Sequence, residues 1–152
     1  MKIIPFLHPD SVSVLSARDK PGAMAELSAS LARHVRTVPA DRLAEVLLDR
    51  ERLSSTGIGD GVAIPHGKLG GLPELVAAFG VSKLGVDFDA IDQKPAHLFF
   101  ALLAPEDSAG VHLKALARIS RLFKNPALRK AILEAGDAKA VYDLIAAEDA
   151  RD

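Results

Sequence analysis

An uninterrupted apolar run in the second half of the chain sets a strong limit on the fold. Leu98–Ala104 contains seven apolar residues in a row, and Pro105 follows it directly. A strand with one face in water alternates apolar and polar side chains, whereas a strand covered on both faces is apolar at every position. The run is much shorter than the ~20 residues of a membrane-spanning helix. It therefore predicts a central strand of a buried sheet, without membrane insertion.

Helical patterns flank a strand-rich middle. Apolar residues spaced three and four apart predict helices that begin at about residues 19, 39, 112, 126 and 137. The strand-like segments between them are Val62–Ile64, Leu75–Ser82, Val86–Ile91 and His97–Leu103. Helices on both sides of a strand-rich middle predict an α/β sandwich with a mostly buried, mixed sheet.

Length and composition favour one folded domain and exclude several classes of function. The 152 residues are 49% hydrophobic and carry a net charge of -1, so the chain lacks the basic surface of a nucleic-acid-binding protein. No cysteine is present, which excludes disulfides, thiol catalysis and cysteine-ligated zinc. The N-terminus lacks the apolar segment of a secretory signal. We therefore expect a soluble, compact domain.

A glycine-rich segment follows the second predicted helix. Gly57, Gly59 and Gly61 come at every second position, which would weaken an ordinary strand but suits positive φ angles or close approach to a ligand. Backbone amides here, with the hydroxyls of Ser55 and Thr56, are able to donate to an anion. The spacing is not that of a P-loop. The segment is a candidate phosphate cradle or, alternatively, an ordinary tight turn.

His66 is the first candidate for chemistry. It lies between Pro65 and Gly67, directly after a short predicted strand, so its ring is presented rather than packed. Imidazole is a competent nucleophile near neutral pH because its ordinary pKa is about 6.5. In a chain without cysteine, a histidine is the natural carrier of a covalent phosphoryl group. The alternative is an ordinary histidine of a surface loop.

Arg50 and His112 are the second and third candidates. Arg50 falls on the same helical face as Leu43 and Leu47, so its guanidinium needs an anion or a carbonyl as partner; alternatively, it only complements the helix dipole. His112 lies near a helix N-terminus, where the dipole favours a neutral ring; alternatively, it is an exposed first-turn residue. His8, His34 and His97 have no comparable setting. We expect His34 to be exposed and His97 to be structural.

Four short segments carry a family pattern. They are Arg50–Glu51, Ser55–Gly59, Ala63–Lys68 and His112–Leu113. Together they resemble the EIIA proteins of the bacterial phosphotransferase system, in the fructose/mannitol superfamily and most of all in its nitrogen-regulatory branch. The resemblance implies that residues 1–152 form one EIIA type-2 domain with a core over residues 8–147. It also implies three layers, with helices on both faces of a mixed sheet.

The resemblance implies a role for each candidate residue. His66 would accept a phosphoryl group from an HPr-type or NPr-type phosphocarrier, with His112 hydrogen-bonded to the ring or to the phosphoryl group. Arg50 would stabilise the phosphate charge. No metal ion or other cofactor is implied, since the donor is a phosphohistidine, and the family is cytoplasmic. Ser54 and Asp60 replace a glycine and an asparagine that are common in the family, and Asp60 adds negative charge beside the proposed phosphate site.

Alternative functions remain open on these grounds. A regulator would control target proteins, such as regulators of potassium transport or of nitrogen-related genes, through its phosphorylation state, and we favour this role over that of a metabolic enzyme. A sugar-specific EIIA would pass the phosphoryl group to an EIIB, whose cysteine this chain lacks. From another class, a metal-dependent hydrolase would use His66, His112 and a carboxylate such as Asp60. The last alternative is an interaction domain with an inactive site.

Overall fold

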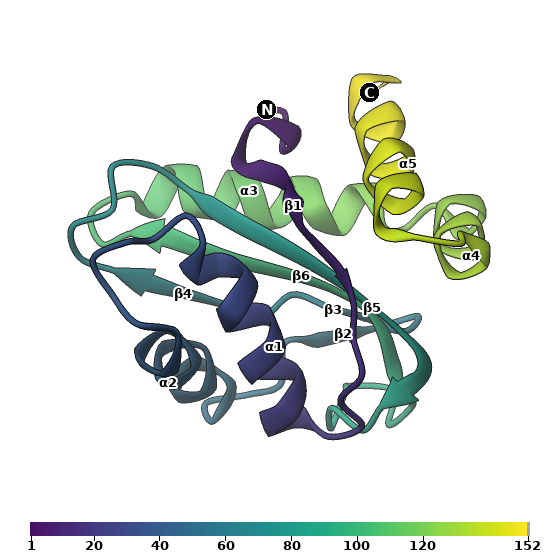
Figure 1. The fold of residues 1–152 in the computed structure, drawn as a ribbon, viewed down its shortest axis with the longest axis horizontal. Coiled ribbons are helices and arrows are strands. Elements are labelled where there is room, and N and C mark those ends of the chain that lie inside the picture. Colours follow the sequence, from purple (N-terminus) through teal and green to yellow (C-terminus); the bar gives the residue numbers. More distant parts are fainter. Residues whose placement is uncertain (152) are drawn as a thin grey trace.

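A six-stranded mixed sheet lies between two layers of helices in the computed structural model, which describes residues 1–151 (Figure 1). The elements in chain order are η1 (Ile4–Phe6), β1 (Leu7–Val14), α1 (Lys20–Ala32), α2 (Ala40–Glu51), β2 (Gly57–Gly59), β3 (Val62–Ala63), β4 (His66–Leu69), β5 (Val76–Val86), β6 (Ala96–Pro105), α3 (Ala109–Leu122), α4 (Pro126–Glu134) and α5 (Ala138–Arg151). Helices α1 and α2 cover one face of the sheet, and α3, α4 and α5 pack against the other. The predicted α/β sandwich is thus confirmed.

The sheet is built around β6. Its strand order is β1-β5-β6-β3-β2, and β4 also pairs with β6. Strands β5 and β6 are antiparallel, while β1 runs parallel to β5, and β3 and β4 run parallel to β6. Strands β3 and β4 pair with successive stretches of β6, Val62 opposite Leu98 and His66 opposite Leu102. This pairing places His66 at the start of a strand in the middle of the molecule.

The side chains of β6 alternate between two apolar cores. Leu98, Phe100 and Leu102 pack with α3, α4 and α5, whereas Phe99 and Ala101 pack with α1 and α2. Successive strand residues point to opposite faces of a sheet. A strand that is buried on both faces must therefore be apolar at every position, which confirms the prediction made from the apolar run.

One expectation about the strands was wrong, and one strand was missed. The sequence predicted separate strands over Leu75–Ser82 and Val86–Ile91, but β5 runs on to Val86, which pairs with Ala96 of β6. The chain then leaves the sheet through residues 87–95. Strand β1 was not predicted, because its residues include a proline and four polar side chains. Such residues are tolerated at the edge of a sheet, where one side of the strand has no partner.

The helices agree with the sequence patterns, and α1 and α4 begin with the expected caps. Asp19 accepts a hydrogen bond from the Gly22 amide at the start of α1, and Asn125 accepts one from the Ala127 amide at the start of α4. These side chains satisfy amides that a helix leaves unpaired in its first turn. Within residues 1–151, no helix is long and apolar enough to cross a membrane.

Gly67 marks a close approach between α2 and β4. A Cβ atom at this position would lie 2.6 Å from Cγ1 of Val46. We therefore expect Gly67→Ala to destabilise the protein by about 1–3 kcal/mol, the usual cost of overpacking. Gly110→Ala is the matched control, because nothing lies within 4 Å of a Cβ atom there. Urea unfolding of both variants measures the difference, and a Gly67→Ala midpoint equal to that of Gly110→Ala would contradict the close approach.

Candidate functional site

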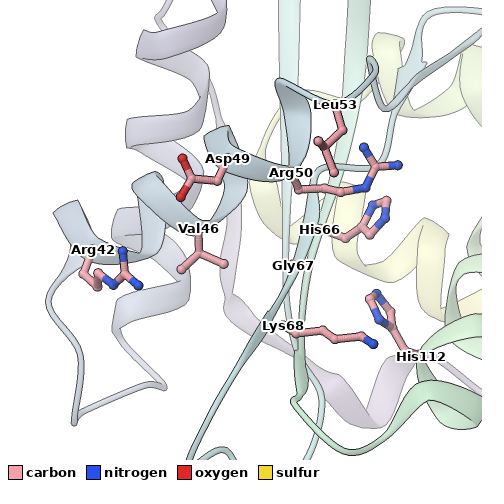
Figure 2. A pocket seen from close by; sticks show the side chains of 9 residues that line it. All are labelled: Arg42, Val46, Asp49, Arg50, Leu53, His66, Gly67, Lys68 and His112. Carbon is pink, nitrogen blue, oxygen red and sulfur yellow. The ribbon is translucent and has the colours of Figure 1, made fainter.

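The C-terminal end of α2, the start of β4 and the first turn of α3 meet around an open pocket of about 480 Å³ (Figure 2). Its lining comprises Arg42, Val46, Asp49, Arg50, Leu53, His66, Gly67, Lys68 and His112. The structure thus brings together Arg50, His66 and His112, which are far apart in the sequence. Three cations and one carboxylate line the pocket along with the two histidines, and this charge balance suits an anion.

The local backbone orients the ring of His66. Its Nδ1 lies 2.7 Å from the carbonyl oxygen of Ile64. A carbonyl oxygen only accepts hydrogen bonds, so Nδ1 carries the proton and donates it. In a neutral ring the other nitrogen, Nε2, then has a free lone pair. The half-buried His66 ring is therefore held in one orientation with one nitrogen free of a proton, in contrast to a freely rotating histidine of a surface loop.

His112 is buried beside His66. The two ring centroids are 5.3 Å apart, the ring planes are inclined by 76°, and only 7% of His112 is exposed (Figure 2). Among the described residues, no hydrogen-bond partner reaches the buried Nε2 of His112. A buried polar atom without a partner is unusual in a folded protein and calls for an explanation. A group bound beside His66 would supply the missing partner.

Arg50 lies at the end of α2, with its guanidinium beside the ring of His66 (Figure 2). Its Nη1 donates a hydrogen bond to the carbonyl oxygen of Ser54 at 3.0 Å. The expectation that this arginine needs an anion or a carbonyl is therefore met by a carbonyl. A guanidinium has five N–H donors, so one such bond leaves donors for an anion in the pocket.

Burial keeps both rings neutral. Burial lowers the pKa of His66; the hydrogen bond to Ile64 opposes this effect, and the charge of Arg50 adds to it. Burial also lowers the pKa of His112, with further lowering by His66 when that ring is protonated and by the charges of Lys68 and Arg50. The neutral ring expected for His112 from the helix dipole thus has burial as its main cause.

These shifts predict a specific pH dependence. In the folded protein, the imidazoles of His66 and His112 should protonate below the midpoint of a histidine peptide, about pH 6.5. The folded protein then binds fewer protons than the unfolded chain in that window, so both rings lower its stability as the pH falls below about 6.5. Titration of the imidazole Cε1–H signals by NMR measures the midpoints. A midpoint above that of the peptide for His66 would contradict the burial argument.

The residues proposed as a phosphate cradle do not lie at the pocket. The Ser55 hydroxyl donates to the carbonyl of Phe88 and accepts from the Gly57 amide, and the Thr56 hydroxyl donates to Glu51. These hydroxyls are occupied inside the protein. None of the four residues proposed for the cradle, Ser55, Thr56, Gly57 and Gly59, lines the pocket. Their bonds hold the turn in place, as expected for the alternative interpretation of the segment as an ordinary tight turn.

Glu51 holds this turn against α2, a role that the sequence patterns did not reveal. Its side chain, in a residue only 5% exposed, accepts from the amide and hydroxyl of Thr56 at 3.1 and 2.6 Å and pairs with Lys20 Nζ at 3.0 Å. Since Glu51 directly follows Arg50, these bonds fix the end of α2 from which the arginine extends. Lys68 was also missed, although its place two residues after His66 on one strand puts both side chains on one face.

The structure does not support a metal site at His66 and His112. Asp60, the carboxylate suggested for it, does not line the pocket. Among residues 1–151, one group of three histidine or acidic side chains has the spacing of a metal site, and it consists of His8, Asp10 and His34. This group lies on other elements. The hydrolase hypothesis therefore lacks its third ligand.

The fold and the site define a class of protein, a one-domain α/β sandwich whose pocket holds a histidine between an arginine and a buried second histidine. Comparison with known families agrees with this class. Residues 5–148 match the family model described as "Phosphoenolpyruvate-dependent sugar phosphotransferase system, EIIA 2". The chain belongs to this EIIA 2 family, as the motifs around Arg50, His66 and His112 indicated.

The chain is similar both to nitrogen regulatory proteins and to fructose-specific components of the phosphotransferase system. A nitrogen regulatory protein of Bradyrhizobium diazoefficiens is 40% identical over 148 residues, covering 96% of this chain and 95% of that protein. The fructose-specific EIIABC component of Bacillus subtilis is 37% identical over 150 residues, or 98% of this chain. The chain spans only 24% of the length of that component.

Solved structures agree with the fold. The crystal structure of the nitrogen regulatory protein IIA-Ntr from Neisseria meningitidis superimposes with a TM-score of 0.85 at 33% identity, covering 93% of this chain and 97% of that chain. The IIA mannitol structure from Escherichia coli has a TM-score of 0.71 at 19% identity, covering 88% of this chain and 95% of that chain. The latter likeness concerns the fold alone.

Proposed function

We propose that the protein is a phosphohistidine phosphocarrier that accepts a phosphoryl group on Nε2 of His66 from an HPr-type or NPr-type carrier. The observation that carries this proposal is the hydrogen bond from His66 Nδ1 to the Ile64 carbonyl. It leaves Nε2 as the reactive nitrogen of a ring whose lowered pKa keeps it neutral. The cationic pocket around the ring suits a phosphoryl group.

The transfer follows from this geometry. Nε2 of His66 forms a bond to phosphorus while the phosphorus–nitrogen bond to the histidine of the carrier breaks, and the carrier ring keeps that electron pair. The proton on Nδ1 stays in its hydrogen bond to Ile64 throughout. Phosphoryl transfer has a loose transition state with charge on the equatorial oxygens, so positioned cations and donors supply most of the catalysis. We assign these roles to Arg50 and to Nε2 of His112.

We favour a regulatory role for the phosphorylated protein. The support is the nitrogen regulatory protein of Bradyrhizobium diazoefficiens, which this chain matches over nearly the whole length of both proteins. The target would be a protein, and the exchange would take place in the cytoplasm with the carrier. The second candidate, transfer to an EIIB, is supported by the fructose-specific relative. Rapid phosphoryl transfer from the labelled protein to a purified EIIB would reverse this preference.

The proposal has a direct test. The purified protein is incubated with phosphoenolpyruvate, the first enzyme of the phosphotransferase system and an HPr-type carrier, and its mass is measured intact. We expect one adduct of about 80 Da, the mass of a phosphoryl group, which is lost in acid and survives in base. Peptide mapping should place it on the segment with His66. Absence of the adduct with both HPr-type and NPr-type carriers would reject the proposal.

A further inference from the structure

Two histidines and an aspartate converge at the edge of the sheet farthest from β2. His8 and Asp10 belong to β1, and His34 follows the end of α1. Ligand atoms of the three side chains all lie within 4.8 Å of one another. Strands β5 and β6 separate β1 from β4, so this cluster is distinct from the pocket at His66.

Several contacts hold this cluster in place. The rings of His8 and His34 are stacked, with centroids 3.7 Å apart and an angle of 8° between the planes. His34 Nε2 and Asp10 Oδ1 are 2.8 Å apart, and Nη1 of Arg33 donates to the Asp10 carbonyl at 2.6 Å. Pro9 stiffens the strand between the two β1 residues. The expectation that His34 is simply exposed was therefore wrong, because His8 covers one face of its ring.

The donor set has a definite chemical preference. Two imidazoles and one carboxylate are ligands that Zn²⁺ and neighbouring transition metals bind, whereas Mg²⁺ and Ca²⁺ prefer oxygen donors alone. His8 and Asp10 are exposed and His34 is half-buried, so water is able to complete a fourth coordination position.

We propose that His8, Asp10 and His34 form a surface site for a divalent ion of the zinc class. Donor atoms bound to one Zn²⁺ lie about 3.3 Å apart, given bonds of about 2.0–2.2 Å. The exposed His8 ring must therefore turn out of its stack to bring its nitrogen to the ion. The proton that now lies between His34 Nε2 and Asp10 must leave that nitrogen before the ion binds there, and it moves either to the other ring nitrogen or to solvent. The guanidinium of Arg33 opposes binding, which makes the site weaker than a structural zinc centre.

A bound ion would connect two elements that the sheet does not link directly. Its ligands come from an edge strand and from the end of a helix on the α1/α2 face of the sheet. Because the ion binds only the folded arrangement, it should raise the melting temperature, by an amount that grows with the logarithm of its concentration above the dissociation constant. The pocket at His66 would be unaffected, since it shares no residue with the cluster.

Zinc titration of the metal-free protein tests the proposal. We expect one Zn²⁺ per chain by isothermal titration calorimetry, and at least about tenfold weaker binding for His34→Ala and for His8→Ala. Asp10→Asn, which keeps the size of the side chain, should weaken binding in the same direction. Thermal melts without zinc check that all three variants are folded. Imidazole NMR signals of His8 and His34 should shift on titration.

A double variant, His66→Ala with His112→Ala, separates the two histidine clusters. It should bind Zn²⁺ as tightly as the unmodified protein. The proposal fails if zinc does not bind saturably, or if the double variant loses binding while His8→Ala and His34→Ala keep it. It also fails if sedimentation shows two chains per ion, because the ligands would then come from different molecules.

Discussion

Replacing His66 with alanine should abolish phosphorylation of the protein. The variant removes Nε2 of His66, which has a free lone pair in the neutral ring because Nδ1 of the same ring donates to Ile64. His112 is a poor substitute because its Nε2 is buried. Intact-mass measurement during incubation with the carrier system should show no adduct at any time. A persisting adduct on His66→Ala would reject His66 as the acceptor.

Arg50→Ala should slow the same reaction about a hundredfold, the usual effect of removing one positioned donor. Arg52→Ala is the matched control, because Arg52 lies two residues further on and pairs with Asp49 at the exposed surface. Both variants lose one positive charge and therefore have the same net charge, but they lose it at different positions. Equal slowing in both would mean that overall charge, and not a positioned guanidinium, supports the transfer. Melting temperatures should change little in either variant.

Asp149→Ala should lower the free energy of unfolding by about 3–5 kcal/mol, the typical cost of removing one partner of a buried ion pair. Asp149 is 1% exposed and pairs with the buried guanidinium of Arg118 at 2.7 Å. It also accepts hydrogen bonds from the amides of Ile3 and Ile4. The substitution would therefore take the carboxylate away from a buried cation and from two backbone amides, and it would loosen the N-terminus from α5.

Asp143→Ala is the control on the same helix, because its pair with Lys139 is exposed. Exposed pairs contribute about 0–1 kcal/mol, so urea unfolding should show little change for this variant. Comparable destabilisation in both variants would contradict the importance of burial.

The Asp149 pair also predicts a loss of stability in acid. Burial alone would raise the pKa of Asp149, but hydrogen bonds from Ile4, Arg118 and Ile3 outweigh it and lower the pKa. The folded protein therefore releases this proton at a lower pH than the unfolded chain. Its stabilising effect is complete above the pKa of the unfolded chain, about 3.9, and is lost as the pH falls below that value. Asp149→Ala should show a weaker dependence in this range.

The sequence predicted those parts of the molecule that are determined by residues close together in the chain. Leu98–Ala104 identified the central strand because burial on two faces removes every polar residue. The spacing of Arg50 from Leu43 and Leu47 identified its helix face, and Pro65 and Gly67 drew attention to His66. The family resemblance then assigned Arg50, His66 and His112 to one site, which local patterns alone do not do.

Other parts depend on contacts between distant residues. Strand β1 has a polar sequence, and only its pairing with β5 makes it a strand. The hydroxyls of Ser55 and Thr56 looked available for an anion until the positions of Phe88 and Glu51 showed their partners. The same holds for His8 and His34, which lie 26 positions apart and stack only because β1 and the end of α1 meet. No local periodicity carries such information.

The partnerless nitrogen of His112 has a consequence for the phosphoryl group itself. A buried polar atom left unpaired costs about 1–3 kcal/mol, and a phosphoryl group on His66 would remove that cost. The two effects are equal by thermodynamic reciprocity. If the phosphoryl group stabilises the folded chain by a given free energy, the free energy released on transferring that group to another protein falls by the same amount. Each 1.4 kcal/mol shifts the exchange equilibrium with the carrier about tenfold toward the loaded protein. If His66 carries a phosphoryl group as proposed, the domain would therefore retain it even at a low concentration of phosphorylated carrier.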